Sequence, residues 1–285
     1  MSAPDLPASV VSMLASANMR RHHAIWHFVR NRWHALSAAD RTRYAAEGWA
    51  PPRLNPLGRP EDLTPAPDRD SGAGLDFLYM HRRMIEHVNE MLAEEADPAY
   101  PRVEGWSPIP WNHDDVDWPM PPVYDPAVAR AKDPSQTAAW QATVAATFEN
   151  DAWLAVQELD DVGSEIEEGI HNWMHMHWSA APWFSQAPGQ DPDDPRNDYL
   201  GSTYSSHVNK AFWKLHGWID DRITQWEQAS GRAADFTGCW EGPAMHGHGP
   251  HHGLETTVRM RPLTEAEARH ASQVFRWALE RVTQR

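Results

Sequence analysis

The sequence predicts a mainly α-helical protein, with a four-helix-bundle core that holds a dinuclear metal site and with long proline-rich loops. Helical apolar periodicity dominates the chain, alternating strand-like segments are scarce, and histidines recur four residues apart on two of the expected helices. The 285 residues suffice to bury a sizeable core. We expect one domain over 1–285, with its core at about 10–228 and a His-rich loop and closing helix in 229–285.

Four long segments repeat apolar residues at the helical spacing of three and four. The first contains the stripe Trp26, Val29 and Trp33, and the third opens on Ser164 with Glu167 three residues later, which is the spacing of a capping box. These segments are 10–36, 75–92, 164–178 and 206–228, and further helices are expected at 37–44, 136–160 and 264–282.

The segments between these helices are rich in proline, glycine or charge, which favours loops. They are 51–70, 98–134, 180–204 and 231–253, and a short strand is expected at 255–261. The 16 tryptophans are expected mainly to pack the core.

Composition narrows the function classes. Forty acidic residues against 25 basic ones argue against a nucleic-acid or anionic-membrane surface, because phosphate binding depends on Lys and Arg. No run of 18 apolar residues is present to span a bilayer, and the N-terminus lacks the pattern of a signal peptide. Cys239 is the single cysteine, so one chain cannot build a disulfide framework, a zinc–thiolate site or an iron–sulfur cluster. We expect a cytoplasmic protein.

Histidine, of which the chain has 17, is the metal ligand that remains. His171 and His175 are four residues apart, so their rings project from one side of a helix, and His216 lies on the inward face of a later helix. We expect these three to bind one metal ion. An isolated histidine pair of this spacing is, alternatively, a polar feature of a surface or core.

The first helix repeats this pattern. His23 and His27 are four residues apart, and His81 lies on the apolar face of the 75–92 helix, which predicts a second site. His22 is the competing ligand because it falls in the Trp26–Trp33 stripe. Two such sites in one bundle core would hold two metal ions close together, and an all-imidazole dinuclear site suits copper, which can cycle with dioxygen.

Three motifs resemble the tyrosinase, catechol oxidase and hemocyanin group of type 3 binuclear copper proteins. Residues 77–82 (Phe-Leu-Tyr-Met-His-Arg) resemble that family's Phe-Leu-x-Trp-His-Arg, and residues 167–175 resemble its Glu-x-x-x-His-Asn-x-x-His. Residues 212–220 resemble its Phe-Trp-x-His-His-x-x-x-Asp, with Leu215 in place of the first histidine. The motifs occur in the family's order across about 75–228.

The chain departs from the family at the first metal site. Gly72 stands where tyrosinases have a loop histidine, so the resemblance favours a hemocyanin-type first site from His23 and His27. Two alternatives remain. The first site is degenerate and these histidines form, with His34 and Arg30, a solvated basic face, or a ligand comes from the cluster His246, His248, His251 and His252.

The resemblance implies a copper-dependent oxidoreductase that uses dioxygen to oxidise o-diphenols or o-aminophenols, with monophenols as a further substrate class. It implies that Glu167 and Asn172 hold a water that accepts the phenol proton, although Glu167 is also suited to a helix N-terminus. Asp220 is a candidate to orient a ligand ring. Two other functions stay open, namely a dioxygen- or copper-binding protein without turnover, and a metal-depleted interaction module.

Overall fold

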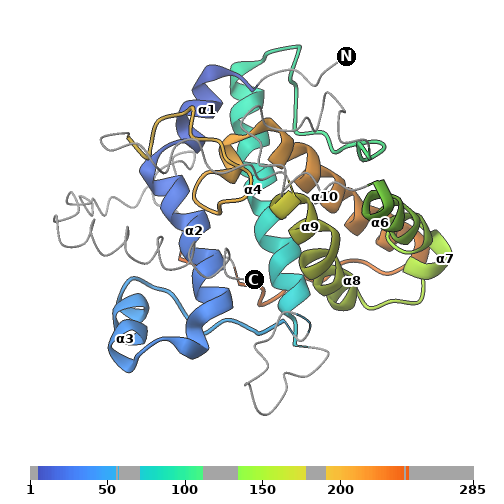
Figure 1. Ribbon diagram of the computed structural model, residues 1–285, viewed down its shortest axis with the longest axis horizontal. Helices are drawn as coiled ribbons and strands as arrows, with labels where there is room; N and C mark the ends of the chain where they lie inside the picture. Colours follow the sequence, from blue (N-terminus) through green and yellow to red (C-terminus); the bar gives the residue numbers. More distant parts are fainter. Residues whose placement is uncertain are drawn as a thin grey trace. The chain divides into compact units, whose positions relative to one another are not determined.

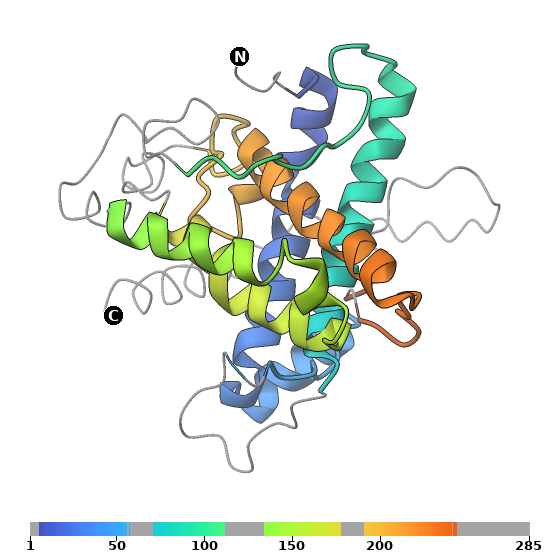
Figure 2. The ribbon, with the colours of Figure 1, turned by 90° about the vertical axis from the view of Figure 1, so that its right-hand side faces the viewer.

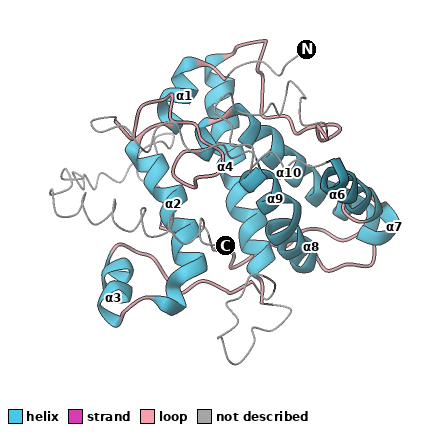
Figure 3. Ribbon diagram, in the orientation of Figure 1, coloured by secondary structure: helices cyan, strands magenta, loops and turns pink. Residues whose placement is uncertain are grey.

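The computed structural model describes residues 6–55, 57, 71–111, 134–177, 191–240 and 242–243. Every regular element in these residues is a helix, as Figure 3 shows, which confirms the mainly α class. The chain divides into two compact units, 1–245 and 246–285. The second unit lies outside the described residues, as do the expected strand at 255–261, the helix at 264–282 and the four-histidine cluster, so one domain over 1–285 stays a prediction.

The helices follow one another with loops of varied length between them (Figure 1). They are α1 (Ala8–Leu14), α2 (Ala17–Arg32), η1 (Trp33–Ala35), α3 (Ala38–Ala46), α4 (Ala73–Glu95), α6 (Pro134–Ala146), α7 (Asp151–Leu154), α8 (Leu159–Ile166), η3 (Glu167–His171), α9 (Asn172–His177), η4 (Ser206–Val208) and α10 (Lys210–Ser230). None of the described helices combines the length and the apolarity needed to cross a bilayer.

The expected single helix over 10–36 is wrong, because the chain breaks at Ser16. The Ser16 side chain accepts a hydrogen bond from the backbone N–H of Met19 and caps α2. A serine that binds the backbone in this way competes with a continuous helix, so α1 ends before Ser16 and α2 begins after it.

The boundaries of two other expected helices are also corrected. The 136–160 segment forms α6 and α7, because Asn150 caps a new helix by accepting from the N–H groups of Ala152 and Trp153. α8 begins at Leu159, so Ser164 lies inside it and does not open it. The carboxylate of Asp160, in the first turn of α8, accepts from the N–H groups of Gly72 and Leu75 and ties α8 to the start of α4.

The long helix α4 contacts both α8 and α10, and the rings of His23 and Trp26 on α2 lie against His81 of α4. These helices can be followed in Figures 1 and 2. The contact between α4 and α8 is close because Gly74 and Gly163 face each other, and a Cβ on either would overlap backbone of the other helix. Large aromatic side chains fill the surrounding core; the fully buried ones include Trp26, Phe77, Phe212, Trp213 and Trp218. The architecture therefore brings helices from four parts of the chain around one point.

Candidate metal centre

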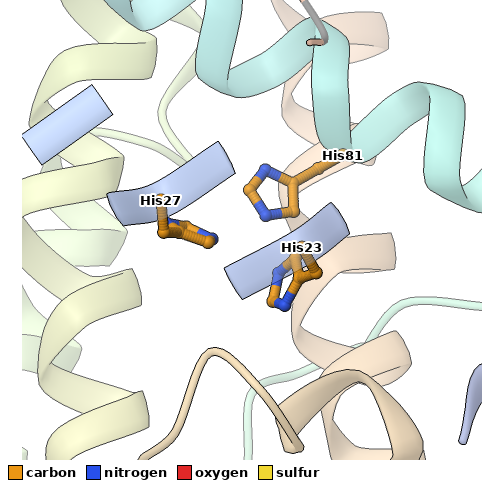
Figure 4. Close-up of side chains that lie close together, drawn as sticks. All are labelled: His23, His27 and His81. Carbon is orange, nitrogen blue, oxygen red and sulfur yellow. The ribbon is translucent and has the colours of Figure 1, made fainter. Parts of the chain in front are cut away.

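The six histidines predicted from the sequence converge at that point. His23 and His27 extend from α2 toward His81 of α4 (Figure 4). Neighbouring rings are in contact, with a centroid distance of 4.8 Å for His23–His27 within α2, and of 5.9 Å for His27–His81 and 4.4 Å for His81–His216 between helices. On the other side of His81, His171 of η3 lies 4.6 Å from His175 of α9 and 5.2 Å from His216 of α10.

Among the described residues, two groups of three histidines have the spacing of a metal site. In each group the ligand nitrogens lie within 4.8 Å of one another. The first group is His23, His27 and His81, as expected. The second is His81, His171 and His216, so His81 replaces the expected His175, whose ring adjoins both His171 and His216. His81 is therefore common to both groups.

Five of the six rings use Nδ1 to donate a hydrogen bond to a backbone carbonyl. The acceptors are Thr203 O for His23 (2.5 Å), Phe77 O for His81 (2.8 Å), Glu167 O for His171 (3.3 Å), Leu200 O for His175 (2.7 Å) and Phe212 O for His216 (2.7 Å). A carbonyl accepts only, so each of these Nδ1 atoms carries the proton and each Nε2 keeps its lone pair. Carbonyls that fix the ring and tautomer in this way are typical of metal-binding histidines.

The nitrogens that face the centre lack other partners. The Nε2 atoms of His23, His81 and His216 are buried and have no hydrogen-bond partner. A buried polar atom without a partner costs about 1–3 kcal/mol, so three at one point need an explanation. A metal ion bound to these lone pairs provides it, and the residues present fit such an ion.

The electrostatics of the centre favour neutral rings. Burial lowers the pKa of His23 to about 3 and that of His175 to about 4. Burial, together with repulsion between neighbouring rings, also lowers the pKa values of His27, His81, His171 and His216 well below the usual value. Neutral imidazole is the form that binds metals, so the site keeps its ligands ready near neutral pH.

The local structure of α2 decides between His22 and His23. The buried face of α2 contains Met19, His23, Trp26 and Arg30, which are spaced three or four residues apart. His22 lies outside this face, where it is half-buried against Trp49. His23 and Arg30 are each only 2% exposed, so the alternative of a solvated basic face is wrong.

A π-helical turn sets the direction in which the side chains of His171 and His175 project. The turn η3 separates α8 from α9, and Gly169 within it has non-helical backbone angles (φ −96°, ψ −111°). The ring of Trp140 lies close to Gly169, so even a Cβ there would be crowded. A π-helical turn changes the direction of the side chains that follow it, and such turns are frequent at functional sites.

The hydrogen-bond partners of three predicted site residues differ from those expected; these residues are Glu167, Asn172 and Asp220. Both oxygens of the buried Glu167 carboxylate bind Arg30, at 2.8 and 2.6 Å, and Asn55 donates to Oε2 at 2.8 Å. Asn172 is exposed, and its amide donates to Glu168 rather than to Glu167. Asp220 accepts from Arg82 at 2.7 Å, so the expected role as the orienter of a ligand ring passes to the backbone carbonyls.

His207 is a buried histidine that the sequence reasoning missed. It lies in η4, its ring centroid is 4.8 Å from that of His23, and its Nε2 donates to Leu14 O at 3.0 Å. It falls at the start of the helix expected at 206–228, but its neighbours Ser205, Ser206 and Asn209 are polar, so no apolar pattern marks it as buried. Arg30 and Asn55 were also missed as partners of Glu167, although Arg30 shares the buried face of α2 with His23.

No known protein-family profile matches the chain, and no curated protein matches it.

Proposed function

We propose that the protein is a copper-dependent oxidoreductase that uses dioxygen to oxidise o-diphenols or o-aminophenols at a dinuclear centre. The observation that carries the proposal is the convergence of six histidines from four parts of the chain, five of which form two groups that share His81. In this proposal His23, His27 and His81 hold one ion, while His171, His175 and His216 hold the other, with His81 between them. In this proposal the core around these helices forms a four-helix bundle.

Copper is the ion that this donor set favours. Both groups of three consist of imidazoles alone, without thiolate or carboxylate, and nitrogen-rich sites favour copper over harder ions. A pair of bound copper ions supplies reversible one-electron steps with dioxygen. Zinc also accepts imidazole ligands, and metal analysis of the purified protein distinguishes the two ions.

The chain's own residues orient the rings and exclude water. His81 and His216 are 2% and 0% exposed, whereas His27 and His175 are half-buried. An aromatic substrate would therefore approach beside one of these two half-buried rings. His27 lies on one side of the centre and His175 on the other. Oxidation of an o-diphenol to the o-quinone releases two electrons and two protons, so two diphenols reduce one dioxygen to two water molecules.

Diphenol oxidation is favoured over monophenol hydroxylation in this proposal. The hydroxylation was expected to use a water held by Glu167 and Asn172, yet the Glu167 carboxylate already binds Arg30 and Asn55. The Arg30 guanidinium occupies both carboxylate oxygens, so neither oxygen is left to hold that water. We therefore assign Glu167 a structural role and leave the substrate proton to another acceptor.

The first test is metal stoichiometry in variants that separate the two groups. The metal-free protein is refilled with Cu(I) or Cu(II), and the bound copper per chain is measured after removal of excess. We expect two ions in the wild type and about one in His23→Ala, His81→Ala or His216→Ala, because each change removes a ligand of one of the two sites. His87→Ala is the matched control, since His87 lies on the same helix and outside both groups.

Equal stoichiometry in all of these variants would refute the dinuclear centre. Turnover is then tested with catechol and o-aminophenol under air, with oxygen consumption followed by electrode. Catechol oxidation by the copper-loaded wild type, and its loss in His216→Ala, is the expected result. A zinc-loaded protein serves as a redox-inactive control.

A second candidate function is reversible dioxygen binding without turnover. The burial of the centre favours it, since each of four rings is at most 4% exposed, namely those of His23, His81, His171 and His216. A centre that is buried to this extent is reached more easily by dioxygen than by an aromatic ring. Oxygen-dependent absorption in the near ultraviolet with no catechol consumption would select this function over the oxidase.

A further inference from the structure

We propose that Arg20 is a positioning residue that fixes the tautomers of His23 and His175 through the loop of residues 191–205. This inference rests on the proposed metal centre for its purpose, although the hydrogen bonds that carry it exist in the chain without metal. It assigns a role to a buried charge that the proposed chemistry does not use.

The guanidinium of Arg20 is buried and bound almost entirely by backbone carbonyls. The side chain is 0% exposed. Nε donates to Ala15 O at 2.9 Å, Nη2 to Asp194 O at 2.9 Å, and Nη1 to Asn197 O and Tyr204 O at 2.9 and 3.3 Å. The nearest carboxylate oxygen, on Asp193, is 4.0 Å away, so the charge-assisted bonds hold backbone rather than a side-chain partner.

Three of these acceptors belong to one loop. Asp194, Asn197 and Tyr204 are spread along residues 191–205, which have no helical or strand hydrogen-bond ladder of their own. One planar cation with donors in a fixed fork can hold such a loop in a single conformation. The acidic composition of the segment, which includes Asp191, Asp193, Asp194 and Asp198, suits a loop wrapped around a cation.

The same loop supplies the carbonyls that fix one histidine on each side of the centre. Thr203 O accepts from Nδ1 of His23, and Leu200 O accepts from Nδ1 of His175. Thr203 directly precedes Tyr204, and Leu200 lies between Asn197 and Tyr204, so both acceptors are in the part of the loop whose carbonyls Arg20 binds. Displacement of the loop would remove both acceptors together.

The remaining histidines provide a contrast within the molecule. Nδ1 of His81, His171 and His216 donates to the carbonyl four residues earlier in the chain, namely that of Phe77, Glu167 and Phe212. Those acceptors move with their own helix and do not depend on the loop. Arg20 should therefore control two of the five tautomers and leave three unchanged.

The test measures imidazole tautomers in metal-free protein by long-range proton–nitrogen NMR of ¹⁵N-labelled histidines. In the wild type we expect all five rings in the Nδ1–H form. In Arg20→Lys, whose ammonium cannot span the acceptors, the signals of His23 and His175 should shift toward the Nε2–H form that predominates in water. Arg21→Lys, at the adjacent half-buried arginine, is the matched control and should match the wild type.

A second variant keeps the proposal testable even where Arg20→Lys fails to fold. Ser205→Ala leaves Arg20 intact and removes only the hydrogen bond from Ser205 Oγ to Tyr199 O, beside Leu200. It should shift the His175 signal alone. If Arg20→Lys does not fold, this variant decides, and an unshifted His175 overturns the proposal.

Copper affinity provides an independent readout. Loss of an outer partner of a metal ligand typically weakens binding about 10–100-fold, which is the decrease expected for Arg20→Lys. Unchanged tautomers of His23 and His175 in a folded Arg20→Lys overturn the proposal, as does an equal shift of all five rings. If the tautomers shift as expected and the wild type binds no copper, Arg20 keeps its positioning role and the proposed function fails.

Discussion

At the scale of single residues, the buried ion pair between Arg30 and Glu167 links the elements that carry the histidines. It joins α2, which supplies His23 and His27, to η3, which supplies His171. Arg30 also donates to Ala73 O at the start of α4 and lies over the ring of Trp26. One guanidinium thus contacts all three of the elements that carry these histidines and His81.

We predict that Arg30→Met destabilises the fold by about 3–5 kcal/mol, because it leaves the buried Glu167 carboxylate without a cation. The double variant Arg30→Met/Glu167→Leu should recover most of this loss, since a matched apolar pair removes the unpaired charge. Urea unfolding followed by circular dichroism measures both. Arg83→Met, at the exposed pair with Glu86, is the control and should leave the midpoint unchanged.

A decrease in Arg30→Met no larger than that of the surface control would show that the pair does not stabilise the fold. Failure of the double variant to recover would show that Glu167 is needed for another reason, such as its contact with Asn55.

At the scale of elements, the distance between α4 and α8 sets the position of His81 relative to His171. The two helices touch through Gly74 and Gly163, and the carbonyl of Gly74 occupies the place that a side chain on Gly163 would need. Any side chain at this crossing must separate the helices, because a packed interior yields little.

Gly163→Ala is therefore expected to cost about 1–3 kcal/mol through overpacking and to weaken copper binding as well. Gly231→Ala is the control. Gly231 has a positive φ of 69° and nothing within 4 Å of its Cβ position, so alanine there should reduce stability by backbone strain and leave copper binding unchanged. The two free energies of unfolding come from denaturant titration and the affinities from copper titration. Wild-type copper affinity in Gly163→Ala would show that the helix spacing does not control the centre.

At the scale of the whole molecule, the buried histidines make the metal-free protein sensitive to acid. Seven described histidines have pKa values lowered by burial, namely His23, His27, His81, His171, His175, His207 and His216. The unfolded chain binds a proton at each of them below about pH 6.5, while the folded chain does not. Stability is therefore complete above pH 6.5 and decreases as the pH falls toward the lowered values, such as about 3 for His23 and about 4 for His175.

Each such histidine contributes a slope of about 1.4 kcal/mol per pH unit, so seven give a slope on the order of 10 kcal/mol per pH unit. A fall of one pH unit in this range therefore removes free energy comparable with the whole stability of a typical domain, about 5–15 kcal/mol. We expect the metal-free protein to unfold cooperatively between about pH 6.5 and 5, as measured by circular dichroism at 222 nm. His87→Ala should leave the midpoint unchanged, and a midpoint below pH 4 would contradict the prediction.

The sequence by itself determined the helical class and most of the histidine cluster. The 3.6-residue periodicity places His171 beside His175 and His23 beside His27 for any α-helix, so these pairs follow from spacing alone. The apolar neighbours of His81 and His216 likewise indicate inward faces, because burial of those faces provides most of the stability of a helix in a protein.

Only the tertiary structure decided which groups contact one another across helices. The buried face of α2 was hidden from hydrophobic patterning because it contains Arg20, His23 and Arg30, whose charges and polar atoms find partners only in distant segments. Glu167 is suited to a base or a cap by its place in the chain, and it binds Arg30 because the fold brings α2 against η3. His81 joins both groups of histidines for the same reason: the distance between rings on separate helices depends on how the helices pack, which residue spacing along one helix does not encode.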